Sequence, residues 1–180
     1  FNNKFYADAN GFYVTQIPAG YRQTSSLLPL AFKIVPKDKK KVVLNNLQKD
    51  IVSRDYHLNT GFLGTKHILA VLTENGLGET AYKIADQKTY PGWGYKISQG
   101  ATSIWETWEP ACRSYDHYAL GTVDEWFYKY LAGIKSKSDG YKEIIIRPYV
   151  LDGLTFAQAS VDTVRGKVSS HWTKNPDNTL

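Results

Sequence analysis

The stretch QGATSIWETW, residues 99–108, is the part of the sequence around which the rest can be interpreted. It places one carboxylate, Glu106, between the indoles of Trp105 and Trp108. A carboxylate between aromatic rings suits general acid–base chemistry, and indole rings stack on the apolar faces of sugars. The alternative is an amphipathic segment whose tryptophans fill a core while Glu106 points to solvent. The pattern predicts a loop that becomes helical near Ser103.

The composition is that of a folded protein. Of 180 residues, 42% are hydrophobic and 14% aromatic, which favours a packed core and argues against disorder. The single cysteine, Cys112, excludes an internal disulfide and a multi-cysteine metal site. No spacing of His, Cys and carboxylate residues indicates a catalytic metal, and the glycines beside Trp93 do not follow a strand as a phosphate-binding loop would. We therefore expect neither a metal nor a cofactor.

The charge pattern points away from nucleic acids. The net charge is +5, and the most basic run is PKDKKK, residues 36–41. Lysines before an apolar periodic segment are typical of a solvated loop and first helical turn, so no nucleic-acid partner is expected. No apolar run reaches the roughly 18 residues of a membrane-spanning helix, so no membrane partner is expected either. The absence of an initiator methionine and of a signal peptide indicates a piece of a longer protein and leaves the compartment open.

Hydrophobic periodicity changes once along the chain, from helical to strand-like. Apolar residues three or four apart predict helices over residues 24–32, 40–54, 63–74, 79–87 and 116–131, the last being the longest, and one or two helical turns at 93–98. Alternation after Gly140 predicts strands over residues 143–147, 154–161 and 166–173. The expected fold class is mainly α, a helix array followed by antiparallel β strands, with domains at 1–137 and 138–180.

Three long motifs carry a family resemblance. They occur in this order and at close spacing: TGFLGT (60–65), YPGWGYKISQGATSIWETW (90–108) and SYDHYALGTVDEWFYKYLAGI (114–134). From about Phe5 to Trp172 the chain closely resembles the C-terminal part of the catalytic domain of bacterial α-L-rhamnosidases, followed by the start of their C-terminal β-domain. The resemblance implies that residues 1–137 belong to an (α/α) six-hairpin toroid, about half of which is encoded here, and that residues 138–180 begin a β-sandwich domain.

The resemblance also implies roles for four residues. Glu106 matches the family's general base of an inverting reaction, and His117 matches a histidine that hydrogen-bonds sugar hydroxyls. Trp105 and Trp93 are expected either to wall the sugar pocket or to pack in the core. An inverting glycosidase also needs a carboxyl group as general acid, and nothing before Gly61 matches the family's acidic segment. Other acidic residues qualify by residue type alone: Asp8, Asp50 and Asp55.

The function implied by the resemblance is that of a glycoside hydrolase. The whole parent protein would be an α-L-rhamnosidase that removes terminal α-L-rhamnose, with inversion, from glycosides or polysaccharides. Its expected partners are such a substrate and the remaining part of the same parent protein, and the isolated chain is expected to be inactive. Two alternatives stay open: a non-catalytic carbohydrate-binding or structural module, and a polysaccharide lyase, whose base would need cationic groups that here lie away from the aromatic stretch. The sequence does not determine the compartment, although an extracytoplasmic one, secreted or periplasmic, is favoured.

Overall fold

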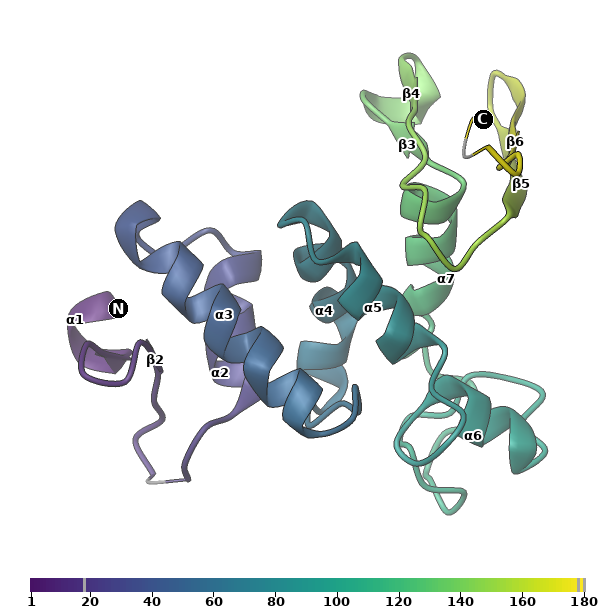
Figure 1. The fold of residues 1–180 in the computed structure, drawn as a ribbon. Helices are drawn as coiled ribbons and strands as arrows, with labels where there is room; N and C mark the ends of the chain where they lie inside the picture. Colours follow the sequence, from purple (N-terminus) through teal and green to yellow (C-terminus); the bar gives the residue numbers. More distant parts are fainter. Residues whose placement is uncertain (18, 178, 180) are drawn as a thin grey trace. The chain divides into compact units, whose positions relative to one another are not determined.

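The computed structural model describes residues 1–17, 19–177 and 179, and it divides into two compact units, Phe1–Gly121 and Thr122–Leu180. We call these the N-terminal unit and the C-terminal unit (Figure 1). Helices make up most of the regular structure in the N-terminal unit, and antiparallel strand pairs make up most of it in the C-terminal unit. The predicted fold class, helices followed by antiparallel strands, is confirmed.

A short hairpin precedes the main helices of the N-terminal unit. Helix α1 (Asn2–Phe5) leads into β1 (Tyr6–Ala7), which pairs antiparallel with β2 (Phe12–Tyr13). Gly11, in the turn between the strands, has a φ of +69°, and a Cβ atom there would lie 2.4 Å from Cγ1 of Val42. Only glycine meets both conditions, so this residue lets the hairpin approach the following helices closely.

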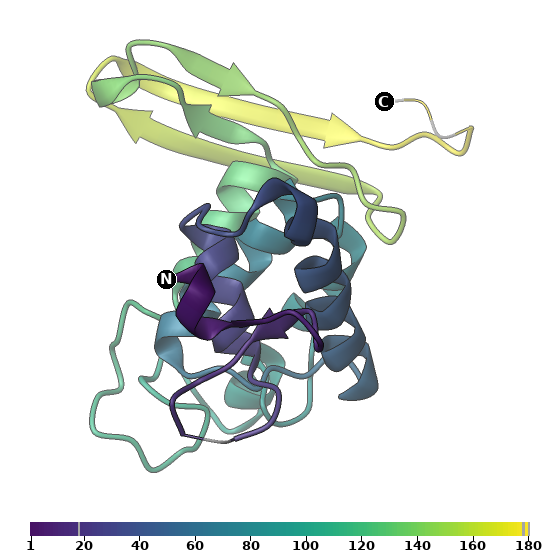
Figure 2. The same cartoon turned by 90° about the vertical axis from the view of Figure 1, so that its left-hand side faces the viewer.

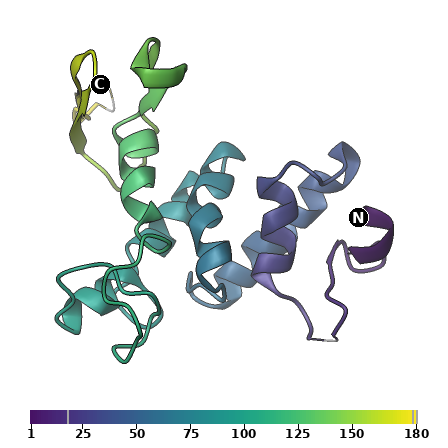
Figure 3. The ribbon, with the colours of Figure 1, turned by 180° about the vertical axis from the view of Figure 1, so that it is seen from behind.

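Four helices form the core of the N-terminal unit: α2 (Gln23–Ala31), α3 (Lys37–Ser53), α4 (Phe62–Glu74) and α5 (Gly78–Ala85). Helix α2 packs against α3 and α4, and α4 packs against α5, as the views from front and back show (Figure 1, Figure 3). Helix α3 buries Val43, Leu47 and Ile51, which lie on one face. These helices, and the shorter α6 (Trp93–Ser98), confirm five of the predicted helical segments to within a few residues.

The helix predicted over residues 116–131 is wrong in its first half. Helix α7 (Thr122–Trp126) and the π-helical turn η1 (Phe127–Leu131) cover the second half, and α3, with 17 residues, is longer. Residues 118–121 form a turn instead, and the backbone N–H of His117 donates to the carbonyl of Ile104 at 2.7 Å, which ties this segment to the preceding loop.

The C-terminal unit contains two antiparallel strand pairs. Strand β3 (Ile134–Ser136) pairs with β4 (Ile144–Ile146), and the 3₁₀ turn η2 (Asp139–Tyr141) lies between them in sequence. Strand β5 (Phe156–Thr163) pairs with β6 (Gly166–Thr173) in the long hairpin that Figure 2 shows at the yellow end of the chain. The three predicted strands are confirmed, whereas β3 was missed because its three residues are too few to show alternation.

Side chains of β6 join this hairpin to the end of the π-helical turn. The Ser170 hydroxyl donates to the carbonyl of Ala132 at 2.7 Å, and the Trp172 indole N–H donates to the carbonyl of Leu131 at 2.8 Å. Both bonds are buried and satisfy carbonyls at a helix C-terminus that would otherwise lack partners. None of the described helices in either unit is both long and apolar enough to cross a membrane.

Candidate functional site

The segment that carries Glu106 is an irregular loop. Residues 99–108 form turns and bends, so the prediction that this segment becomes helical near Ser103 is wrong. Instead, the loop folds back on itself in a hairpin-like way: the Glu106 N–H donates to the carbonyl of Ser114 at 3.0 Å, and the His117 N–H donates to the carbonyl of Ile104 at 2.7 Å. These two antiparallel contacts bring the backbone of Glu106 and that of His117 onto neighbouring segments of one loop, 99–121.

Contacts of its imidazole ring hold the side chain of His117 in place. Its Nδ1 accepts a hydrogen bond from the N–H of Ala119 at 3.3 Å, and the ring stacks on Tyr118 with a centroid distance of 5.3 Å. The ring of Phe62, at the start of α4, meets it edge-on at 5.8 Å. A neutral imidazole that accepts at Nδ1 carries its proton on Nε2, so this half-buried histidine can donate a hydrogen bond to a hydroxyl oxygen.

Trp93 and Trp105 are both largely buried, with exposed fractions of 7% and 6%. The Trp93 indole N–H donates to the carbonyl of Leu120 at 2.9 Å, and its ring meets that of Trp108 edge-on at 5.1 Å. Trp105 packs edge-on against Tyr115 at 5.6 Å. In this structure both indoles therefore pack as core residues that support the loop, and contact with a sugar stays a prediction for each.

Lys96 is a site residue that sequence reasoning missed. It lies on α6, is 2% exposed, and donates from Nζ to the carbonyl of Trp105 at 2.8 Å. The same ammonium lies 4.8 Å from the centre of the Trp108 ring. Burial lowers the pKa of Lys96 to about 8. Nothing in the sequence marks this lysine, because lysines on short amphipathic helices are normally solvated.

A second carboxylate of the same loop, Glu109, is hydrogen-bonded by the hydroxyl of Tyr90. This bond lowers the pKa of the Glu109 carboxyl and raises the pKa of the Tyr90 hydroxyl. The bond favours the ionised carboxylate, because a donated hydrogen bond stabilises the charged form. Glu109 is therefore suited to remaining deprotonated and poorly suited to donating a proton.

A cavity of about 630 Å³ lies beside this loop in the N-terminal unit. Its walls come from the start of α2, from the connection between α3 and α4, and from the segment before α6. Cationic, neutral polar and aromatic side chains line it, among them Arg22, Arg54, His57, Asn59, Tyr90 and Trp108. Polar groups and ring faces in one hollow are the usual lining of a site that binds a polar ligand such as a sugar.

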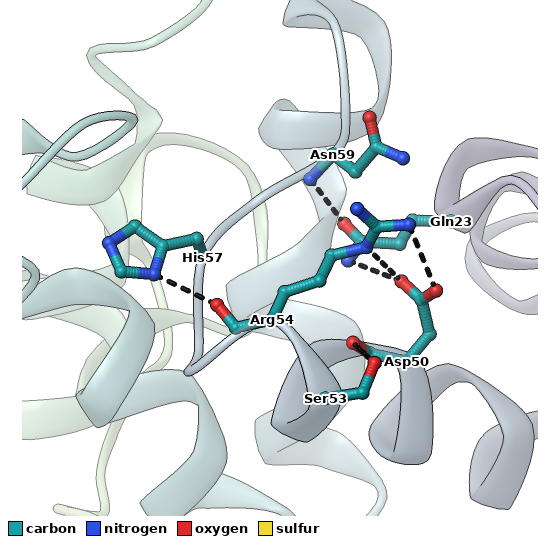
Figure 4. Close-up of polar contacts among 6 residues, drawn as sticks. All are labelled: Gln23, Asp50, Ser53, Arg54, His57 and Asn59. Atoms are coloured by element: carbon teal, nitrogen blue, oxygen red, sulfur yellow. Dashed lines mark hydrogen bonds and ion pairs between the residues drawn. The ribbon is translucent and has the colours of Figure 1, made fainter.

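A hydrogen-bond network holds one wall of this cavity (Figure 4). Asp50 accepts bonds from Nε of Arg54 and from Nε2 of Gln23, both at 2.9 Å. The Gln23 side-chain oxygen accepts the Asn59 N–H at 2.8 Å, and Nδ1 of His57 bonds the carbonyl of Arg54 at 2.9 Å. Asp50 is thus linked through Arg54 and Gln23 to the loop that connects α3 to α4.

Neither Asp8 nor any metal-binding group adds to this site. Asp8 forms an ion pair with Lys39 at 2.7 Å on the surface of the N-terminal unit. Across residues 1–17, 19–177 and 179, no cluster of three or more His, Cys, Asp and Glu side chains has the arrangement needed to hold a metal ion.

Comparisons with known proteins agree along the whole chain. Residues 1–131 match the family model of the bacterial alpha-L-rhamnosidase six-hairpin glycosidase domain, and residues 133–180 match that of the bacterial alpha-L-rhamnosidase C-terminal domain. An alpha-L-rhamnosidase of Streptomyces avermitilis is 38% identical over 163 residues, which are 85% of this chain and 16% of that protein.

Solved structures give the same result. The alpha-L-rhamnosidase from Dictyoglumus thermophilum superposes with a TM-score of 0.87 and 40% identity, over 97% of this chain and 20% of that one. The Streptomyces avermitilis enzyme complexed with L-rhamnose superposes with a TM-score of 0.80 and 36% identity, over 86% of this chain and 16% of that one. The chain therefore spans about a sixth to a fifth of the length of these relatives.

Proposed function

The chain belongs to the bacterial α-L-rhamnosidases, a family of glycoside hydrolases, and we propose that the whole protein that carries it removes terminal α-L-rhamnose from glycosides or polysaccharides with inversion. In this proposal residues 1–137 are the C-terminal part of the helical catalytic domain, and residues 138–180 begin a β-sandwich domain. The observation that carries the proposal is the loop 99–121, whose two backbone contacts bring Glu106 and His117 onto adjacent segments.

Glu106 is the proposed general base. In an inverting hydrolysis the base removes a proton from water on the face of the sugar opposite to the leaving group, while a general acid protonates the leaving oxygen. The two carboxyl groups then stand roughly 6.5–9.5 Å apart to admit the water. His117 would donate from Nε2 to a hydroxyl of the rhamnose ring. Trp105 and Trp93, which do not line the 630 Å³ cavity, are proposed to border the rhamnose pocket of the whole enzyme and, by their burial, to hold its shape.

The general acid is proposed to come from the part of the protein outside this chain. A general acid must keep its proton near neutral pH, which requires a raised pKa. Glu109 has the opposite property, because the Tyr90 hydroxyl lowers its pKa. Asp50 is engaged by Arg54 and Gln23 and is only 14% exposed. Glu109 therefore does not meet the requirement, and this supports a donor supplied by the rest of the enzyme.

The substitution Glu106→Gln in the whole enzyme tests the proposal. It keeps the size of the side chain and removes the base, so kcat should fall by roughly 10²–10⁴-fold with p-nitrophenyl α-L-rhamnoside. Glu109→Gln, in the same loop, is the matched control and should change kcat by less than about threefold, a barrier change below about 1 kcal/mol. A Glu106→Gln enzyme that works at nearly the parental rate would show that the base lies elsewhere.

Stereochemistry gives a second, independent test. Proton NMR during the first minutes of hydrolysis distinguishes the two anomers of free L-rhamnose. Inversion of an α-L-rhamnoside gives the β anomer first, before mutarotation mixes the two. Early appearance of the α anomer would mean that a covalent intermediate forms, with Glu106 as nucleophile rather than base. If instead the whole protein binds rhamnose without hydrolysing any rhamnoside, the non-catalytic carbohydrate-binding alternative is correct.

A further inference from the structure

Two contacts of Lys96 flank Glu106 in sequence. Its Nζ donates to the carbonyl of Trp105, the residue before Glu106, at 2.8 Å. It also lies 4.8 Å from the ring centre of Trp108, two residues after Glu106. The lysine comes from α6, a different element, so one buried ammonium joins α6 to a backbone carbonyl before the proposed base and to an indole ring after it.

The surroundings of this ammonium explain why its contacts matter. Among the described residues, no carboxylate lies within ion-pair distance of Nζ of Lys96. The titratable groups that face it are Glu109 and Cys112, both from loop 99–121, and Glu109 is already bonded by Tyr90. A buried charge needs compensation, and here the compensation comes from one peptide carbonyl and one indole face. Both partners belong to the segment that carries Glu106.

We propose that Lys96 is a positioning residue for Glu106: its ammonium fixes the loop backbone just before the catalytic carboxylate and the Trp108 ring just after it. This inference rests on the proposed function of Glu106. The Glu106 N–H is fixed by its bond to Ser114, and Lys96 fixes the preceding carbonyl at Trp105. The peptide unit that enters Glu106 is therefore held on both of its polar atoms. Misplacement of a reacting group by about 1 Å can lower a rate by roughly 10²-fold.

A purely structural role predicts a different outcome from a positioning role. Methionine has nearly the shape of lysine without its charge, but it leaves the buried carbonyl of Trp105 without a donor, which destabilises the fold. If Lys96 only stabilises the fold, Lys96→Met lowers the unfolding midpoint and leaves kcat unchanged. If Lys96 positions Glu106, the same variant stays folded and loses turnover.

Kinetics of the whole enzyme with p-nitrophenyl α-L-rhamnoside decide between these roles. Lys96→Met should lower kcat by about 10- to 100-fold and change KM by less than about threefold, in addition to lowering the unfolding midpoint through the unpaired Trp105 carbonyl. The matched control is Lys83→Met, because Lys83 also lies over an aromatic ring, that of Tyr56 at 4.6 Å, but outside loop 99–121. This control should keep the parental kcat.

The pH profile supplies a readout that does not depend on the stability of the methionine variant. As the pH rises through about 8 the Lys96 ammonium loses its proton, so part of the parental kcat should be lost with a midpoint there. Lys96→Arg keeps a charged donor at all these pH values and should restore kcat to within about fivefold of the parent while removing that step from the profile.

The outcomes separate the two proposals. If Lys96→Met keeps kcat within about twofold while Glu106→Gln is inactive, the positioning role is wrong and the function of Glu106 stands. If Lys96→Met fails to fold, the pH profile of kcat for Lys96→Arg decides. A profile that matches the parental one overturns the positioning role, and a profile that lacks the step near pH 8 supports it. If Glu106→Gln retains activity, the proposed function itself is wrong.

Discussion

Replacement of Trp93 by phenylalanine tests whether this indole acts as a core residue. The change removes the N–H that donates to the buried carbonyl of Leu120 at 2.9 Å. Leaving a buried acceptor unpaired costs about 1–3 kcal/mol. The smaller ring costs about 1–2 kcal/mol more through lost burial and the cavity it leaves. Trp93→Phe should therefore lower the free energy of unfolding by about 2–5 kcal/mol.

Trp105→Phe is the matched control for this change. Trp105 is as buried as Trp93, at 6% against 7%, and lies in the adjoining loop. Its indole packs on Tyr115 and, among the described residues, no hydrogen bond from it is seen. Only the ring-size cost of about 1–2 kcal/mol then applies. Urea unfolding followed by the far-ultraviolet circular dichroism of the helices should separate the two variants by about 1–3 kcal/mol.

The same pair of variants also tests sugar binding. If the two indoles are core residues, both variants keep the KM of the whole enzyme for p-nitrophenyl α-L-rhamnoside. If either ring stacks on the sugar, its variant should raise KM by about tenfold, which corresponds to about 1.4 kcal/mol of lost binding. Unfolding free energies that agree within about 0.5 kcal/mol for the two variants would refute the reasoning about the Leu120 hydrogen bond.

Three further predictions follow from other parts of the chain. Gly133 and Gly140 both have a positive φ, but only a Cβ at Gly133 would lie 2.2 Å from the nitrogen of Pro148. Gly133→Ala should therefore lower the free energy of unfolding by at least about 3 kcal/mol and Gly140→Ala by only about 1 kcal/mol, which hydrogen exchange of β3 and β4 can measure. Tyr90→Phe should raise the pKa of Glu109 toward its ordinary value in a carbon-13 NMR titration, because the hydrogen bond from Tyr90 is the main cause of the lowered pKa. The small stabilisation from this bond is present at neutral pH and is lost as the pH falls through the lowered pKa. The isolated chain should show no measurable rhamnosidase activity and should self-associate in sedimentation; turnover within about tenfold of the whole enzyme, about 1.4 kcal/mol in barrier, would show that a carboxylate within this chain serves as the acid.

Regular elements with strong local signals could be predicted from the sequence. In α3, Val43, Leu47 and Ile51 are spaced by four residues, and all three are buried. The hairpin β5–β6 follows from alternating residues on both sides of a short turn, and its second strand runs over the predicted residues, Gly166–Thr173. In both cases the pattern that defines the element lies within a few consecutive residues.

Elements that depend on distant hydrogen bonds could not be predicted in this way. Residues 116–131 have apolar spacing that fits a helix, yet residues 118–121 form a turn and the His117 N–H bonds the carbonyl of Ile104 in the preceding loop. The predicted helical turn near Ser103 fails for the same reason, because the backbone there pairs with the segment that follows Ser114. Periodicity reports which face of an element is apolar, and it carries no information about which amide bonds which carbonyl across a loop.

In the candidate site, too, the residue types could be predicted from the sequence, whereas the positions of the residues relative to one another could not. Glu106 and His117 could be named from the motifs, because their chemistry is a property of the side chains. Their proximity depends on the two backbone contacts that close loop 99–121, and the burial of Lys96 depends on the Trp105 carbonyl and the Trp108 ring. A lysine in a short amphipathic helix has no local feature that distinguishes a solvated side chain from a buried one. The residues proposed to perform the chemistry are therefore readable from the chain, whereas the one proposed to hold them in place is found only after the loop is folded.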